Sequence, residues 1–571
     1  MNKHIKLVAA LIFGTSLLST GCLDETFPQQ GTVTVDQAVE APNSFDNFVT
    51  ACTSTLSGEF IYDAAKMSPY DYGYTSFFLQ RDVMGQDVVC EGTDYEHYST
   101  WYTCGVGLGP TSGICQIPWS LYYKWIKNCN VVLSIAGKEP SADHKVGAGI
   151  AHAMRAMFYM DLARMYAPQT YVRNHEALTV PIISEETSVE QATNNRNATN
   201  EKIWSFILDD LNAAETLLAD YQRPDKTTPD LSVVYGLKAR AYLTMEQWGD
   251  AEKYAKLAQK GYTAMTEAQY LDHDTGFNTP NDAWMFMTEF DSEDPNITEN
   301  DGDSSWGSQM ILEITSESGC GYAANYGTPK RIDAHLLETI PQSDWRRKCF
   351  IDPELDELVA AVDPVEDSEG EVDEEATHEA IMKVVVDYLK DVSDYPDALY
   401  NTAVAAPSGL FSGLSLKFRA AGGQAGHDNV KIGFCVAVPL MRVEEMILIE
   451  AEAAGMQEEA RGKALLESFA KTRDPQYTYN TLQSFRDNVW WQRRVELWGE
   501  GFATFDIKRL EKGITRSYAG TNHPEGYRWN TDVVPDWMNL CIVQTETNYN
   551  QACVSNPTPI QPTEDSPEKV W

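Results

Sequence analysis

Two stretches of the sequence collect aromatic side chains that follow no helical period. Residues 70–102 and 291–326 both read as loops, and the second contains Trp306, Tyr322 and Tyr326. A Tyr or Trp face packs on the C–H face of a sugar ring, while nearby polar side chains bond the hydroxyl groups of the sugar. We therefore predict three stacking rings and three polar contacts: Tyr95, Trp101 and Trp306, with Arg81, Asp94 and Asp303.

Each of these predicted contacts has a structural alternative. The rings could pack within their own loops or against a partner protein, and Arg81 could belong to a structural ion pair. The Trp and Tyr side chains of residues 119–125 are assigned to a helix core instead, because they lie in a helical stretch.

Sequence patterns that mark common enzyme sites are missing. The chain has no GxSxG, HExxH, GxxxxGK[ST] or strand-following GxGxxG, and its ten histidines include no i, i+4 pair that could hold a metal. We predict no catalytic residue, no metal site and no cofactor. Two alternatives stay open, because a glycoside hydrolase needs only two carboxylates and calcium could bind the acidic run described below.

The charge of the chain excludes several classes of partner. Among 571 residues, 44 are Lys or Arg and 84 are Asp or Glu, which gives a formal net charge of −40. Because this charge repels phosphate, we predict no nucleic-acid partner. Hydrophobic residues make up 43% of the chain, enough for a large core and contrary to general disorder.

The amino terminus has the pattern of an export signal. Lys3 and Lys6 precede an apolar stretch at 7–18, which is too short to cross about 30 Å of hydrocarbon as a helix. The Leu-Ser-Thr-Gly-Cys that follows resembles a bacterial lipobox. We therefore expect residues 1–21 to be removed and Cys22 to carry lipid, with a plain secretory signal as the alternative.

The cysteine count favours disulfides. Ten cysteines remain after Cys22, an even number in a chain that reads as exported. Two local pairs are plausible, Cys104 with Cys115 and Cys541 with Cys553, although spacing alone does not fix the pairing. The absence of CxxC argues against zinc ribbons and thioredoxin-like redox sites.

Helical periodicity dominates the elements that must position these residues. Apolar residues recur at helical spacing from 119 to about 262, and 440–471 reads as a second helical pair. Small residues and aromatics within 230–262 match a tetratricopeptide repeat, in which paired helices approach closely. The matching positions are Tyr235, Ala239, Tyr242, Ala251 and Ala258. We predict a mostly α fold built on a tetratricopeptide-like helical platform.

The centre of the chain has a different composition. In 263–435, short apolar runs alternate with Gly, Asn, Asp and Ser clusters, which indicates a loop-rich region with a few small strands. Within it, residues 352–379 carry thirteen carboxylates and no Lys or Arg, typical of a solvated, mobile surface insertion. We therefore divide the chain into a signal peptide and three regions: 1–21, 22–262, 263–435 and 436–571.

A charged motif near the carboxyl terminus has the composition of a structural core. Residues 493–509 interleave Arg, Lys, Glu and Asp with three aromatic rings around a Gly-Glu-Gly turn. We predict that these charges form an ion-pair network that pins the motif to the helical platform. A catalytic pair of Glu496 and Glu500 is the alternative.

Five segments, taken in order, resemble the SusD/RagB family of outer-membrane nutrient-binding lipoproteins of Bacteroidetes. They are 81–87 (RDVMGQD), 153–182 with AMRAMFY and VPI, 203–211 with IW and ILDDL, 446–453 ending in EAEA, and 493–509 (RRVELWGEGF, then FDIKR). The acidic residues just after Cys22 also resemble the flank that sends such lipoproteins to the cell surface. One departure is Gln492, where the family usually has an acidic residue.

The resemblance implies a function and a location. It implies a surface-exposed lipoprotein, anchored in the outer membrane through Cys22, that captures oligosaccharides and passes them to a TonB-dependent, SusC-like β-barrel transporter. It also implies that loops in about the two aromatic stretches build the ligand site side by side. Two alternatives stay open: a RagB-like protein that binds peptides or glycopeptides, and a glycoside hydrolase.

Overall fold

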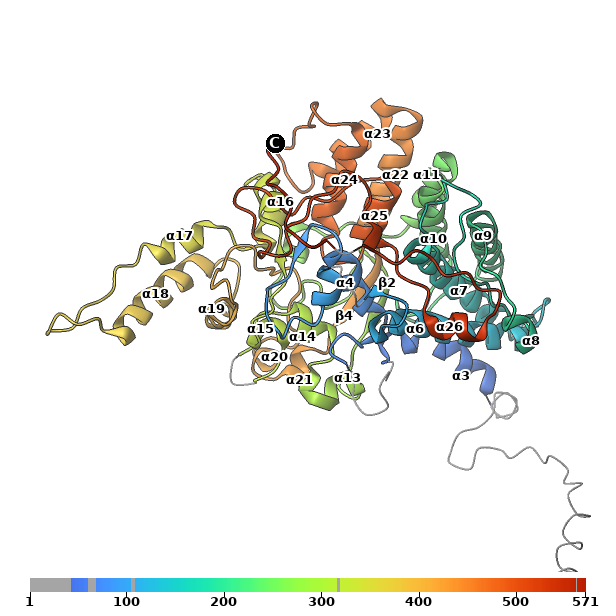
Figure 1. Ribbon diagram of the computed structural model, residues 1–571, viewed down its shortest axis with the longest axis horizontal. Helices are drawn as coiled ribbons and strands as arrows, with labels where there is room; N and C mark the ends of the chain where they lie inside the picture. Colours follow the sequence, from blue (N-terminus) through green and yellow to red (C-terminus); the bar gives the residue numbers. More distant parts are fainter. Residues whose placement is uncertain (1–42, 60–67, 104–107, 316–318, 561) are drawn as a thin grey trace, which may run out of the picture.

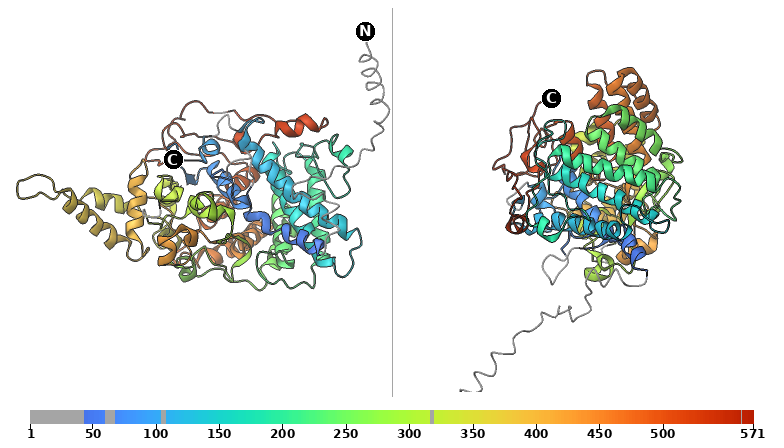
Figure 2. Two further views of the ribbon diagram at one scale, coloured as in Figure 1. Left: turned by 90° about the horizontal axis from the view of Figure 1, so that it is seen from below. Right: turned by 90° about the vertical axis from the view of Figure 1, so that its right-hand side faces the viewer.

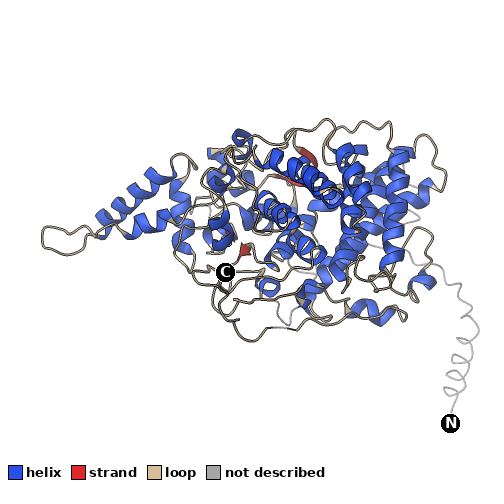
Figure 3. Cartoon of the chain, turned by 90° about the horizontal axis from the view of Figure 1, so that it is seen from above, coloured by secondary structure: helices blue, strands red, loops and turns tan. Residues whose placement is uncertain are grey.

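The computed structural model describes residues 43–59, 68–103, 108–315, 319–560 and 562–571. The predicted signal peptide, 1–21, and the predicted lipid-bearing Cys22 lie outside these residues. Helices dominate the described chain, and its strands form two small two-stranded sheets (Figures 1 and 3). The predicted mostly α fold with a few small strands is confirmed. No helix in the described ranges has the length and apolar character needed to cross a membrane.

Packed helices from both halves of the chain form the helical platform, on the right and at the top of Figure 1. Consecutive helices pack on each other, and α22 joins the two halves by packing on α11. The platform helices are α6 (Gly113–Ala136), α7 (Lys145–Tyr166), α9 (Asn200–Leu217), α10 (Leu231–Thr244), α11 (Trp248–Ala258), α22 (Val443–Gln457), α23 (Glu459–Ala470), α24 (Phe485–Glu496) and α25 (Ala503–Arg509).

The tetratricopeptide-like pair occurs where the sequence predicts it. Within 230–262, α10 and α11 form two packed helices, and Ala239, Ala251 and Ala258 are fully buried. Lys238 stands at a repeat position that usually holds a large apolar residue. Its ammonium group is buried and pairs with Glu215 of α9, so the charge is compensated where it leaves water.

Two antiparallel strand pairs connect the central region with the rest of the chain. β1 (Val88–Val89) pairs with β3 (Arg331–Ile332), and β2 (Trp284–Glu289) pairs with β4 (Ala437–Arg442). All these strand residues except Glu289 are buried. Each pair therefore joins two segments that lie far apart in the sequence.

Short helices fill much of the region predicted to be loop-rich. Most of those labelled in Figure 1 lie below the helical platform, and their loops carry the second aromatic stretch. These helices are α12 (Glu267–Tyr270), α13 (Pro295–Thr298), α14 (Trp306–Met310), α15 (Tyr322–Asn325), α16 (Ala334–Thr339), α19 (Pro396–Ala405), α20 (Gln424–Asp428) and α21 (Val430–Gly433). Further helices are α3 (Ser44–Ala51), α4 (Ser76–Val83), α5 (Ser99–Tyr102), α8 (Val189–Ala192) and α26 (Gln544–Tyr549).

The acidic run is a projecting helical arm. α17 (Glu354–Ala360) and α18 (Glu374–Leu389) extend away from the body, with a bridge between Glu366 and Val372 near the tip (Figures 1 and 2). The predicted surface insertion is therefore helical over α17 and α18. The carboxylates remain in solvent, as expected, but Asp373 caps α18 by accepting the backbone N–H of Ala376 at 3.0 Å. No group of acidic, His or Cys side chains among the described residues could hold a metal ion.

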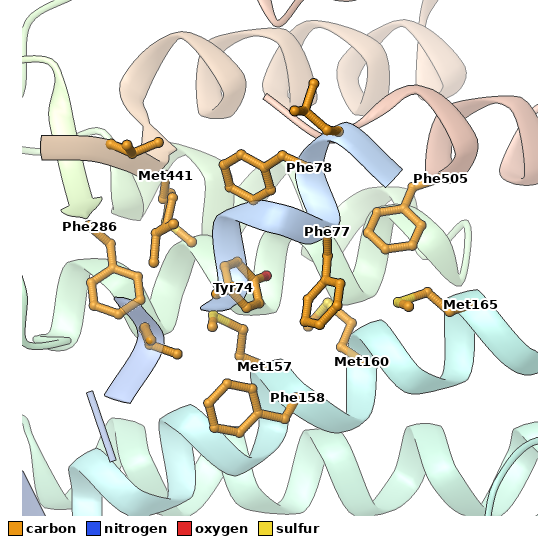
Figure 4. Packing of buried hydrophobic residues seen from close by; sticks show 14 of the residues in the cluster. Tyr74, Phe77, Phe78, Met157, Phe158, Met160, Met165, Phe286, Met441 and Phe505 are labelled. Carbon is orange, nitrogen blue, oxygen red and sulfur yellow. The ribbon is translucent and has the colours of Figure 1, made fainter. Parts of the chain in front are cut away.

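A large apolar core lies beneath α4. Tyr74, Phe77 and Phe78 pack with Met157 and Phe158 of α7 in one cluster of buried side chains (Figure 4). Large rings and flexible methionines can fill an irregular space between helices. Through this cluster, the part of the first aromatic stretch around α4 lies in the interior of the helical platform.

Glu496 is the centre of a buried ion-pair network in the charged motif. Its carboxylate lies 3.1 Å from Arg346, 3.3 Å from Arg442 and 3.2 Å from Arg473, and the side chain is fully buried. Burial alone would raise the pKa of Glu496, but the three guanidinium groups outweigh it and hold that pKa well below its usual value. The predicted network is confirmed.

Further buried pairs join the five segments singled out in the sequence. Arg494 of the fifth segment donates to Asp87 of the first at 2.9 Å. Arg509 of the fifth pairs with Glu452 of the fourth at 2.6 Å. Arg155 of the second pairs in a two-bond geometry with Asp210 of the third, both at 2.8 Å. These segments are therefore joined through charges that stabilise one another away from water.

The catalytic alternative for Glu496 and Glu500 is wrong. Glu500 is 4% exposed and pairs with Lys417 at 2.7 Å and Arg442 at 2.8 Å. Despite its burial, these cations hold the pKa of Glu500 below its usual value. Neither carboxylate reaches solvent or can supply a proton at neutral pH.

One predicted disulfide is also wrong. Cys541 and Cys553 both carry thiols, and the Cys541 thiol instead donates to the carbonyl of Pro557. Cys104, the predicted partner of Cys115, lies outside the described residues, so that pairing stays a prediction.

We expect Glu496→Gln to lower the free energy of unfolding by about 3–5 kcal/mol, because it leaves three buried guanidinium groups without their central charge. Chemical denaturation at pH 7 measures this change. Glu458→Gln is the matched control, since Glu458 is 69% exposed and 3.9 Å from Arg461, and a change below about 1 kcal/mol is expected for it.

The effect of Glu496→Gln on stability should also depend on pH. A carboxylate with a depressed folded-state pKa stabilises fully above its unfolded pKa, 4.5 for Glu496, and loses that contribution as the pH falls. The wild type should therefore lose stability below that pH more steeply than Glu496→Gln. Equal unfolding free energies for Glu496→Gln and Glu458→Gln at pH 7 would contradict a central role for the Glu496 carboxylate.

Candidate ligand-binding face

The two aromatic stretches of the sequence meet at the molecular surface. The ring centroids of Tyr95 and Tyr326 are 5.4 Å apart, those of Tyr326 and Tyr322 are 5.2 Å apart, and Tyr322 lies 4.5 Å from the imidazole of His97. We call these four side chains the ring platform. Tyr95 is 54% exposed, and Tyr326 and His97 are partly exposed, so the platform is open to a ligand.

The pairing of β1 with β3 brings the two halves of the ring platform together. Val89 of β1 lies opposite Arg331 of β3, and the loop that carries Tyr95 follows β1 directly. In that loop the carboxylate of Glu96 accepts from the Lys330 ammonium, next to β3, at 2.6 Å, with both side chains buried. Strand pairing and this ion pair therefore fix the spacing of the rings.

Turn geometry supports the other half of the platform. Gly321 has a φ of 94°, which an L side chain rarely adopts, and its N–H donates to Asp303 Oδ1 at 2.7 Å. The N–H of Tyr322 donates to the Ser308 hydroxyl at 3.0 Å, and the Tyr326 hydroxyl donates to the Gly319 carbonyl at 3.0 Å. Hydrogen bonds therefore hold Tyr322 through its backbone and Tyr326 through its hydroxyl group.

The ring platform is uncharged at neutral pH. Burial and the nearby charge of Lys330 lower the pKa of His97 to about 4, so its imidazole is neutral. Burial also raises the pKa of Tyr322 to about 12. The Nε2 atom of His97 has no hydrogen-bond partner among the described residues. That nitrogen is buried, so the platform presents neutral ring faces rather than an imidazole contact, and such faces suit a neutral ligand.

Three of the six predicted contact residues lie on or beside this face. Asp94 and Tyr95 are exposed there, and their ligand contacts stay a prediction. Asp303 is 6% exposed and accepts the Gly321 N–H, so it supports the turn beneath the tyrosines. Burial, together with the charge of Asp301, raises the pKa of Asp303 to about 6.

The other three predicted contact residues are buried, and the exposure assumed for them is wrong. Trp306 is 1% exposed and packs edge-on against Phe418. Trp101 is 2% exposed, within the core cluster. Arg81 is 2% exposed and pairs with Asp161 at 3.2 Å, the structural alternative considered for it. Each was assigned to the surface because it lies outside helical periodicity, but long-range packing covers it.

Sequence reasoning also left two platform residues, Tyr322 and Tyr326, out of its selected contacts. Both lie in the second aromatic stretch, so their region was identified correctly. Their signal is the glycine-rich turn before them, in which Gly319 and Gly321 adopt positive φ.

Comparison with known proteins identifies the fold. Residues 82–243 match a SusD-like family model described as starch-binding and associating with the outer membrane. The chain is similar to a SusD-like carbohydrate-binding protein from Bacteroides vulgatus, with a TM-score of 0.65 and 21% identity, over 90% of this chain and 97% of that chain. No curated protein matches the sequence.

Glycan-binding proteins are among the similar structures. Surface glycan-binding protein A from Bacteroides thetaiotaomicron matches with a TM-score of 0.61 and 17% identity, over 91% of this chain and 99% of that chain. Its complex with laminarihexaose matches with a TM-score of 0.60 and 16% identity, over 90% and 98% of the two chains. The chain therefore has the SusD-like fold, and the resemblance drawn from its five segments is confirmed.

Unfolding measurements separate the surface rings from the buried ones. We expect Trp306→Ala to lower the free energy of unfolding by about 3–5 kcal/mol, because it empties a large space in the core. Tyr95→Ala should change it by no more than about 0.5 kcal/mol, since more than half of that side chain is in solvent. Similar losses for the two variants would contradict the assignment of Tyr95 to an open face.

Proposed function

We propose that this chain is a surface glycan-binding lipoprotein that binds neutral oligosaccharides on the ring platform without chemical conversion. The observation that carries the proposal is the contact between the two aromatic stretches, which produces a set of rings with Tyr95 exposed, Tyr326 partly exposed and Tyr322 buried behind them. Solved proteins with the same fold include a glycan-binding protein in complex with laminarihexaose. Family likeness and local chemistry point to the same class of ligand.

The binding step follows from the chemistry of the platform. A sugar ring packs its C–H face on Tyr95 or Tyr326, which removes apolar surface from water. Tyrosine hydroxyls and the exposed Asp94 carboxylate then bond sugar hydroxyls. Because such contacts are few and solvent-exposed, the affinity is modest, which suits capture followed by release.

Release, in this proposal, is to a SusC-like TonB-dependent transporter in the outer membrane. Its support is the likeness to a family described as associating with the outer membrane. A lipid on Cys22 would anchor the chain there and leave the platform outside the cell. The description of binding without catalysis is supported by the ion-paired burial of Glu496 and Glu500, which keeps both away from any substrate.

We expect the double variant Tyr95→Ala/Tyr326→Ala to lower affinity for the bound glycan at least tenfold, a change of about 1.4 kcal/mol in binding free energy. Calorimetry against a panel of neutral oligosaccharides, with basic and neutral peptides as a second panel, measures it. Tyr549→Ala is the matched control, because Tyr549 is 78% exposed on α26, and it should not change affinity.

Three results would count against this proposal. Unchanged glycan affinity in the double variant, with the fold intact, would remove the ring platform from the binding site. Binding of peptides but of no glycan would instead favour the RagB-like alternative, and glycan turnover would favour a hydrolase.

We expect Cys22→Ala to move the protein from the membrane fraction to the soluble fraction after export, because the lipid is the proposed anchor. Immunoblots of separated fractions measure the distribution. Retention of the variant on washed membranes would show that another contact holds it there.

A further inference from the structure

A cavity of about 430 Å³ opens on a part of the molecule away from the ring platform. It lies between the segment that follows α16 and the loop that joins α23 to α24. In Figure 1, α16 and α24 are in the upper part of the molecule, whereas α14 and α15, beside the ring platform, are in the lower part. The cavity is therefore separate from the platform, and its volume is within the usual range for small-molecule sites.

The lining of this cavity combines aromatic rings with amide and hydroxyl groups. Tyr477 and Trp491 supply the rings, and Gln476, Asn480 and Gln483 supply amides. No Lys or Arg is among the described lining residues. The single carboxylate there, on Asp474, is buried and accepts the backbone N–H of Gln476 at 2.8 Å.

This lining differs from that of another cavity, of about 580 Å³, beside α3. Six carboxylates line this cavity beside α3, on Asp46, Asp143, Asp225, Glu289, Asp291 and Asp294. A neutral sugar gains little from such a concentration of negative charge. The amide-rich cavity, in contrast, offers donors and acceptors for hydroxyl groups at no cost in burying charge.

The two rings of the amide-rich cavity are held in place from behind. The indole N–H of Trp491 donates to the Thr339 hydroxyl at 2.8 Å, and the buried Arg346 guanidinium lies 5.9 Å from the indole centroid. The rest of the partly exposed indole lines the cavity. Burial raises the pKa of Tyr477 to about 12, so its hydroxyl stays neutral. Fixed rings lose little conformational freedom when a ligand binds.

The loop that carries the amides is also fixed. The Asn488 side chain donates to the carbonyls of Asn480 and Ser484, both at 2.9 Å, and accepts the N–H of Asn480 at 3.1 Å. At the start of the loop, the Trp345 indole donates to the Thr472 carbonyl at 2.9 Å. The cavity therefore has preformed walls, as a binding site for a small rigid ligand requires.

We propose that this cavity is a second carbohydrate subsite, which takes one or two sugar residues of a neutral glycan. The inference rests on the proposed function, since it assigns the same class of ligand to a second place. The ring faces of Trp491 and Tyr477 pack on the sugar, and the amides of Gln476, Asn480 and Gln483 bond its hydroxyls. Two sites on one rigid body raise the apparent affinity for a long polysaccharide above that for a short fragment.

Hydrogen–deuterium exchange of the full chain, with and without neutral hexasaccharides, tests the subsite. The probes are laminarihexaose and the maltose, cellulose, xylan and mannan hexasaccharides at millimolar concentration. We expect slower exchange in peptides that cover 474–491 as well as in those that cover 94–98 and 321–327. In Trp491→Ala the first protection should disappear and the second remain, while affinity for the matching polysaccharide should fall about tenfold.

Leu482→Ala is the matched control, because Leu482 lies in the same loop, is 96% exposed and is not among the lining residues. It should leave both protections unchanged. If Trp491→Ala does not fold, Tyr477→Ala replaces it, and the wild-type exchange data alone still decide the question.

The outcomes distinguish the two proposals. Protection confined to 94–98 and 321–327 overturns the second subsite and leaves the ring platform intact. Protection confined to 474–491 sustains the subsite and overturns the platform as the binding face. No protection and no binding with any of the five probes overturns both.

Discussion

Burial of the Glu496 carboxylate among three guanidinium groups is the interaction on which the rest of the structure depends. A charge so far from water is stable only with partners held at close range, and those partners come from three separate parts of the chain: Arg346, Arg442 and Arg473. The carboxylate therefore permits one arrangement of the helical platform relative to β4 and the segment after α16. An arrangement that separated any one of these parts would remove one of the cations that stabilise this buried carboxylate.

This constraint reaches the ring platform through a short series of contacts. Next to Glu496, Arg494 pairs with Asp87 at 2.9 Å, and the Trp498 indole donates to the carbonyl of Asp87 at 2.8 Å. Asp87 immediately precedes β1, and β1 pairs with β3, so the loops on either side of this pair are placed together. The exposed tyrosines thus depend for their position on charges buried in the body. A surface made of loops can in this way keep the fixed geometry that ring stacking requires.

The sequence predicts the parts of this arrangement that depend on local pattern or on charge. Helical spacing identifies α10 and α11, and the density of paired charges in 493–509 identifies a structural network. Regional aromatic content identifies the two stretches that meet at the platform. Exposure of single residues is different, because Trp306 is covered by Phe78 and Phe418 from distant segments and Arg81 meets Asp161 of α7. No local pattern contains that information.

The acidic arm and the cysteines show the same limit in other ways. Charge density in 352–379 predicts solvation correctly, yet the Asp373 cap of α18 and an apolar strip that includes Leu355 and Val385 are enough to make the segment helical. The short spacing of Cys541 and Cys553 makes a disulfide between them plausible. In the fold, the Cys541 thiol instead has a backbone carbonyl as its partner. Composition therefore indicates the environment of a segment more reliably than its exact contacts.

A structure of the protein crystallised with a neutral oligosaccharide tests the central claim most directly, namely that buried ion pairs hold exposed rings ready for a sugar. The account predicts sugar density packed face-on against Tyr95 or Tyr326, with the tyrosines and the Glu496 network in the positions described here. Density found only on other surfaces, or a ring platform that rearranges to admit the ligand, would contradict it.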